Sequence, residues 1–139
     1  MRYLLDTNII SELRKGRRAD EGVRFWMEAT PASSLWVSVL VLGELRRGVE
    51  ALRRRDPVSA DVLEVWLRAQ ASMHAGRVLP VDEEVADRWG RLNVPDLVPT
   101  VDGLLAATAL VHGMTVVTRN TRDFAPTGVE LLNPFSSAR

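Results

Sequence analysis

Four carboxylates in this sequence occupy positions where an acidic side chain could do chemistry. Asp6 lies between the apolar stretches YLL and II, where burying an unpaired charge would cost several kcal/mol. The other three are Glu44 in GELRRG, Asp102 at the start of an alanine-rich segment, and Asp123 in TRDF. Carboxylates that share a site need a counter-charge, and their oxygens suit Mg²⁺ or Mn²⁺. The sequence predicts a divalent metal site if the fold brings these acids together.

The predicted elements would bring them to one edge of a sheet. Apolar segments of strand length alternate with segments of helical periodicity. Strands are expected at 3–6, 34–38, 77–81, 114–118 and 129–134, and helices at 7–16, 20–30, 39–55, 58–76, 82–93 and 101–113. This order predicts a single α/β domain over residues 1–139, with a mainly parallel sheet of about five strands covered by helices on both faces. Ligands of such sheets bind beyond the carboxyl ends of the strands, where the acids are expected.

The two longest helical segments carry apolar stripes that predict which faces are buried. The expected inward residues are Leu42, Leu45, Val49 and Leu52 in the first, and Val62, Val65, Trp66 and Ala69 in the second. The Asp56-Pro57 pair separates the two segments, because proline cannot continue a helix.

The composition excludes several kinds of site. The chain has no cysteine, which rules out disulfides, thiolate zinc sites and cysteine nucleophiles. Without an apolar run of the ~18 residues that cross a bilayer, a cytoplasmic location away from membranes is expected. The 18 basic and 18 acidic residues balance, yet arginines cluster in RKGRR, ELRRG and ALRRR. Such clusters either bind phosphate or form a solvated helix face, since Glu50 lies four residues from both Arg46 and Arg54.

Four segments, in order, resemble a known family. LLDTNIIS, SVLVLGELRRG, DGLLAATALVHGMTVVTRNTRDF and GVELLNP are similar to motifs of the PIN-domain ribonucleases, and most similar to those of the VapC and FitB toxins of bacterial type II toxin–antitoxin systems. The segments extend over nearly the whole chain. One departure is Gly103, where the family more often has alanine, serine or cysteine.

The resemblance implies a Mg²⁺- or Mn²⁺-dependent endoribonuclease that cleaves structured RNA, such as tRNA or ribosomal RNA. Its catalytic and metal-binding acids would be Asp6, Glu44, Asp102 and Asp123, and its supporting polar residues Asn8, Thr118 and Asn120. We expect Arg46, Arg47 and Arg119 to bind RNA phosphates, a role that positions RNA without selecting its sequence.

The resemblance also implies protein partners. A cognate antitoxin of the VapB or FitA type would inhibit the toxin. The toxin would form a homodimer and would contact DNA only through the antitoxin.

Other α/β enzymes fit the sequence less well. A haloacid-dehalogenase-like phosphatase needs an aspartate where Asn8 stands, and a phosphoreceiver domain needs a lysine near the end of the sheet, whereas the sole lysine is Lys15. No glycine fingerprint for a nucleotide follows the first strand. The rival from another class is a PIN-like module that binds RNA or a protein without cutting. Clustered acids argue against it, because binding to phosphate gains nothing from negative charge.

Overall fold

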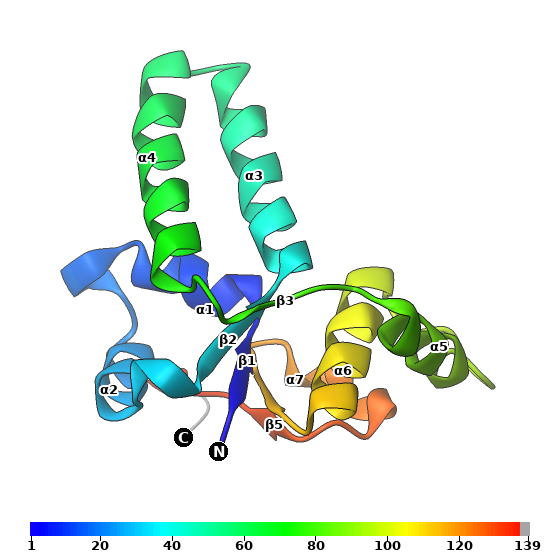
Figure 1. Ribbon diagram of the computed structural model, residues 1–139. Helices are drawn as coiled ribbons and strands as arrows, with labels where there is room; N and C mark the ends of the chain where they lie inside the picture. The colour runs from blue at the N-terminus through cyan, green and yellow to red at the C-terminus, as the bar shows by residue number, and fades with distance from the viewer. Residues whose placement is uncertain (137–139) are drawn as a thin grey trace.

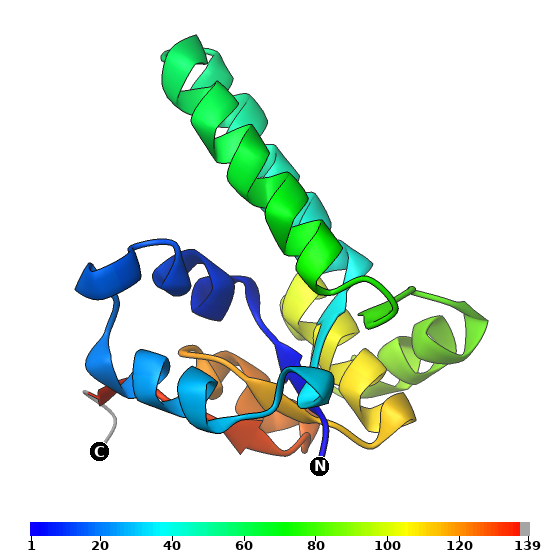
Figure 2. The same ribbon diagram turned by 60° about the vertical axis from the view of Figure 1, so that its left-hand side comes forward.

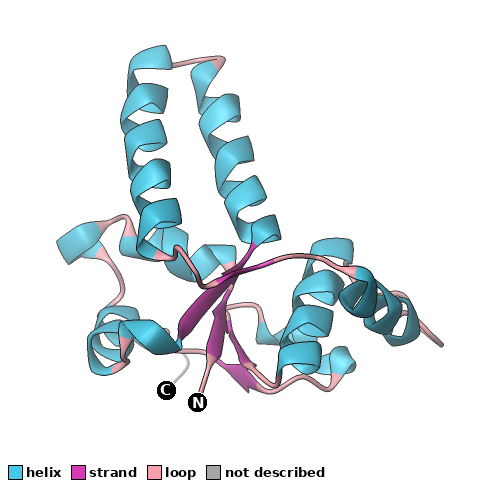
Figure 3. Ribbon diagram, in the orientation of Figure 1, coloured by secondary structure: helices cyan, strands magenta, loops and turns pink. Residues whose placement is uncertain are grey.

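The computed structural model describes residues 1–136 and has a five-stranded parallel sheet at its centre. The strands are β1 (Tyr3–Leu5), β2 (Leu35–Ser38), β3 (Val78–Leu79), β4 (Thr115–Val117) and β5 (Leu131–Leu132). Their order across the sheet is β3-β2-β1-β4-β5, and all four pairings are parallel. Figure 3 shows these short strands gathered between the helices. The predicted α/β fold is confirmed, with β1 in the central position.

Helices cover both faces of this sheet. They are α1 (Thr7–Leu13), α2 (Glu21–Ala29), α3 (Val39–Arg53), α4 (Pro57–Met73), α5 (Glu83–Leu92), α6 (Thr100–His112) and α7 (Thr121–Phe124). Helices α1 and α2 lie on one side, and α5 and α6 on the other (Figures 1 and 2). The segment at 119–128, between the last two predicted strands, contains α7 and a short 3-10 helix, Ala125–Thr127. None of the helices within residues 1–136 is long and apolar enough to cross a membrane.

Helices α3 and α4 form a hairpin that projects from the edge where the strands end (Figures 1 and 2). Pro57 is the first residue of α4, and the Asp56 side chain accepts a hydrogen bond from the backbone N–H of Ser59. The Asp-Pro pair therefore starts α4, whereas α3 already ends at Arg53.

The predicted inward face of α4 is largely wrong. Val62 and Val65 are 67% and 69% exposed, and Ala69 is also exposed. The side chains that pack inward are Leu67, which is buried, and Trp66 and Leu63, which are partly buried. Apolar residues occupy more than one face of this helix, so its periodicity could not identify the face that meets α3.

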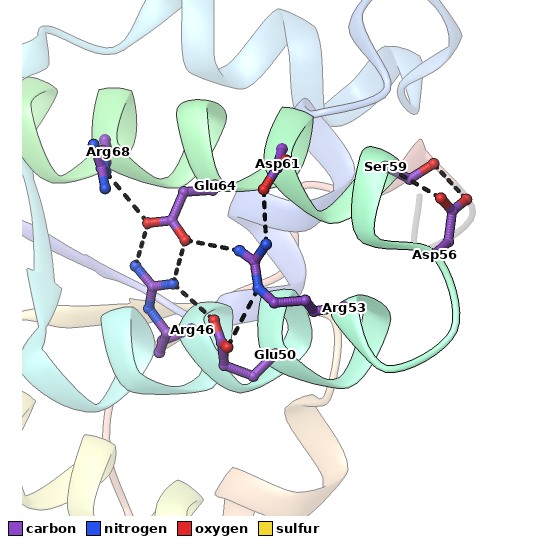
Figure 4. A network of polar contacts seen from close by, with 8 residues as sticks. All are labelled: Arg46, Glu50, Arg53, Asp56, Ser59, Asp61, Glu64 and Arg68. Atoms are coloured by element: carbon purple, nitrogen blue, oxygen red, sulfur yellow. Dashed lines mark hydrogen bonds and ion pairs between the residues drawn. The ribbon is translucent and has the colours of Figure 1, made fainter.

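A network of ion pairs joins the two helices of the hairpin (Figure 4). Glu64 of α4 accepts two hydrogen bonds of 2.7 Å from the Arg46 guanidinium, and Arg53 and Arg68 also contact its carboxylate. Glu50 pairs with Arg46 as the helical spacing suggested, and with Arg53 rather than Arg54. Much of the arginine cluster is therefore used to hold α3 against α4.

Two glycines allow close packing. At Gly22 in α2, an added Cβ would meet the carbonyl oxygen of Pro134 and lie 2.7 Å from the nitrogen of Ser136. At Gly103 in α6, it would lie 2.7 Å from Val98 and 3.2 Å from Trp89. The departure from the family pattern at Gly103 thus lets α5 and the loop after it pack against the start of α6.

Candidate active site

Asp6 lies where β1 ends and α1 begins, and it is buried, with 5% of its surface exposed. Its Oδ1 accepts a hydrogen bond of 2.8 Å from the backbone N–H of Thr7. Its Oδ2 accepts hydrogen bonds from the Thr118 hydroxyl at 2.8 Å and the Asn8 amide at 3.2 Å. Burial raises the pKa of Asp6, these bonds oppose the rise, and the nearby negative charge of Glu44 adds to it. Hydrogen bonds therefore hold this buried acid in place.

Asn8, Thr118 and Asn120 connect Asp6 to the segment after β4. The Asn8 side chain also donates to Thr118 Oγ1, at 3.3 Å, and accepts from the backbone N–H of Arg119 at 3.1 Å. The backbone N–H of Asn120 donates to Thr118 Oγ1 at 2.9 Å. Asn8 and Thr118 thus contact Asp6 directly, and Asn120 contacts it through Thr118.

The pKa of Asp102 shows the effect of the surrounding charges most clearly. It lies in the first turn of α6, and its pKa is raised to about 6. Burial is the largest cause, followed by the negative charges of Asp6, Asp123 and Glu44. No cation or hydrogen bond from residues 1–136 offsets this rise. The structure therefore brings the four acids near enough to repel one another.

Glu44 lies near the base of the hairpin, in α3, and its side chain is 26% exposed. Its Oε1 accepts a hydrogen bond of 2.7 Å from the Thr7 hydroxyl, and its Oε2 lies 3.8 Å from Arg47 Nη2. Surface pockets lie on both sides of it: one reaches Val101 of α6, and the other reaches Arg14 and Trp66. Glu44 thus projects between α1 and the start of α6.

Asp123 is exposed in α7 and acts on Asp102 through its charge. Its backbone N–H donates to the carbonyl of Asn120, which ties α7 to the segment after β4. Asp123 is the most solvated of the four acids.

The four acids fit a divalent cation by their chemistry. They are hard oxygen donors, and Asp102 has negative charge around it that nothing in residues 1–136 neutralises. In this part of the chain, no group of three or more Asp, Glu, His or Cys side chains could hold a metal ion as arranged. Asp6 and Glu44 accept hydrogen bonds from protein donors, which offset part of their charge.

The three arginines assigned to RNA differ in their contacts. Both terminal nitrogens of Arg46 bond to Glu64, and one also bonds to Glu50. Arg47 is exposed and lies beside Glu44, at the edge of a pocket. Arg119 is exposed, with its guanidinium 4.6 Å from the centre of the Phe135 ring. Arg47 and Arg119 are therefore exposed, whereas Arg46 belongs to the hairpin network.

Sequence reasoning missed Thr7. A hydroxyl directly after Asp6 was visible, but its partner Glu44 is 37 residues away, and nothing in the sequence joins them.

Comparisons with known proteins identify the family of this chain. Residues 3–129 match the PIN domain family. The chain is 34% identical to the VapC ribonuclease Y4jK of Sinorhizobium fredii, with 97% of this chain and 99% of that protein covered. It is 33% identical to toxin FitB of Neisseria gonorrhoeae, with 95% and 97% covered. The solved structure of FitAB bound to an IR36 DNA fragment superposes with a TM-score of 0.85 at 33% identity, over 95% of this chain and 94% of that one.

This chain therefore belongs to the PIN domain family. Within the family it is of the VapC/FitB toxin type. The resemblance seen in the sequence motifs is confirmed.

Proposed function

We propose that this protein is a Mg²⁺- or Mn²⁺-dependent endoribonuclease and the toxin of a type II toxin–antitoxin pair. The observation that carries the proposal is that the negative charges of Asp6, Asp123 and Glu44 all act on Asp102 and, with burial, raise its pKa to about 6. Two relatives that match nearly full length, a VapC ribonuclease and the toxin FitB, support the same class.

Each acid has a proposed role. Asp6 and Asp102 are the main metal ligands, and Asp123 and Glu44 complete the coordination or hold waters. A bound cation would lower the pKa of water and stabilise charge developing on the phosphate. Thr118 and Asn8 keep Asp6 oriented by hydrogen bonding to its Oδ2. Arg47 and Arg119 bind the RNA backbone.

The proposed substrate is structured RNA, such as tRNA or ribosomal RNA, in the cytoplasm. The proposed partner is a VapB- or FitA-like antitoxin, through which the protein would meet DNA; the solved complex of FitAB with DNA supports this arrangement. A homodimer is also proposed. Exposed apolar residues along α4 could serve such protein contacts: Val58, Val62, Val65 and Met73.

One observation favours the alternative, a PIN-like module that binds without cutting: residues 1–136 contain no ready-made metal-binding group. The two functions differ in their response to Mn²⁺. Only the nuclease gains from a cation that lets its acids approach a phosphate.

The test is RNA cleavage with Mn²⁺, with Mg²⁺ or with EDTA, using tRNA and ribosomal RNA fragments. The wild-type protein should cleave only with a metal. Asp6→Asn should abolish cleavage even at saturating metal, whereas Asp96→Asn, which changes an exposed acid in the loop before α6, should leave the rate unchanged. Cleavage by Asp6→Asn would remove Asp6 from the mechanism. Cleavage by the wild type in EDTA would remove the metal.

A further inference from the structure

Thr7 is hydrogen-bonded to two of the four acids at once. Its backbone N–H donates to Asp6 Oδ1 at 2.8 Å, and its hydroxyl donates to Glu44 Oε1 at 2.7 Å. One acid ends β1 and the other lies in α3, so this single residue links two elements that are far apart in the sequence.

The two bonds depend on the Thr7 side chain to different degrees. The bond to Asp6 comes from the backbone and is the N-terminal cap of α1, so any residue but proline could make it. The bond to Glu44 needs the hydroxyl. A threonine at the first position of a helix is not required for helix formation, because β-branched residues have only ordinary helix propensity. The hydroxyl is therefore free to serve another purpose.

Glu44 needs a restraint if it is to stay near Asp6. Asp6 and Asp102 both repel its carboxylate. Among residues 1–136, the cation that pairs with Glu44 is Arg47, whose Nη2 lies 3.8 Å from the other carboxylate oxygen and belongs to an exposed side chain. The Thr7 hydroxyl, itself half-buried, thus makes the short contact that holds Glu44 toward Asp6 against this repulsion.

We propose that Thr7 is a positioning residue that holds Glu44 beside Asp6, so that both carboxylates can serve one divalent cation. This inference rests on the proposed function. It predicts that losing the hydroxyl weakens metal binding by about 10-fold or more, the effect typical of groups that orient metal ligands.

The test measures Mn²⁺ affinity by titration calorimetry on the purified full chain without RNA, for the wild type and for variants at Thr7 and Glu44. Thr7→Val keeps the shape of the side chain and removes the donor, so it should bind Mn²⁺ about 10-fold more weakly. Thr7→Ser keeps the donor and should bind like the wild type. In a Glu44→Gln background, adding Thr7→Val should change the affinity by less than about twofold, because the residue acts through Glu44. A melting curve of every variant shows whether it is folded. Thr7→Ala is melted as well, as a second variant that lacks the hydroxyl.

The outcomes separate this proposal from the proposed function. If the wild type neither binds Mn²⁺ nor cleaves RNA, the proposed function itself fails. If the wild type binds and Thr7→Val binds equally well, or if Thr7→Val has its full effect in the Glu44→Gln background, Thr7 is not a positioning residue. Loss of the folded state in both Thr7→Val and Thr7→Ala would assign the contact to the fold and overturn the proposal.

Discussion

Asp102→Asn should stabilise the metal-free protein while removing its proposed activity. The pKa of Asp102 is raised from 3.8 to about 6, and a shift of that size corresponds to roughly 3 kcal/mol. Partial exposure screens this charge. The dipole of α6 also favours a negative charge in its first turn by up to about 1 kcal/mol. The expected net gain for the asparagine variant is therefore about 1–2 kcal/mol near neutral pH, or a rise in melting temperature of about 3–6 °C.

The pH dependence follows from the direction of the shift. Because the pKa of Asp102 is higher in the folded than in the unfolded protein, the folded protein binds more protons between 3.8 and about 6. Stability contributed by the neutral acid is present below this window and is lost as the pH rises through it. The gain from Asp102→Asn should thus be complete above about pH 6 and should shrink toward zero near pH 4.

The assay is thermal melting in EDTA from pH 4 to pH 8, with Asp96→Asn as the control for removing an exposed acid. Added Mn²⁺ should then raise the melting temperature of the wild type more than that of Asp102→Asn, because the cation neutralises the same repulsion. If Asp102→Asn melted at or below the wild-type temperature in EDTA at pH 7.5, the electrostatic reasoning would be refuted.

Three further predictions concern the surroundings of the site. Glu64→Gln should lower the melting temperature by weakening the hairpin network, and the difference from wild type should shrink in 1 M NaCl, where ion pairs are screened; an equal difference in high salt would contradict this. Gly22→Ala should lower the free energy of unfolding, measured in urea, by about 1–3 kcal/mol, because its methyl group would meet the backbone of Pro134 and Ser136. Gly90→Ala in α5, which has open space around it, is the control and should be neutral or stabilising. Arg47→Ala should weaken RNA binding in a salt-dependent way without changing the melting temperature. Arg46→Ala should instead lower the melting temperature. The reverse pattern would show that Arg46, and not Arg47, binds RNA.

The strands and the position of Asp6 could be predicted from the sequence because both depend on local patterns. A short apolar run predicts a buried strand, and an acid at its end predicts a side chain at the carboxyl edge of a parallel sheet. The roles of two residues depended on contacts that no local pattern contains. Arg46 faces Glu64, 18 residues away, and Thr7 faces Glu44, 37 residues away. The prediction of the buried face of α4 was wrong for a different reason: apolar residues lie on more than one face of this helix, so only its packing selects the buried one.

The four acids are restrained to different degrees, and this difference indicates where a cation would matter most. Asp6 accepts three hydrogen bonds and Glu44 accepts one, so protein donors already offset part of their charge. Asp123 is exposed and is solvated by water. Asp102 is partly buried, and no donor or cation in residues 1–136 offsets the repulsion from the other three. A metal ion bound by these acids would therefore relieve more repulsion at Asp102 than at the other three, whereas Asp6 would stay fixed by Thr118 and Asn8.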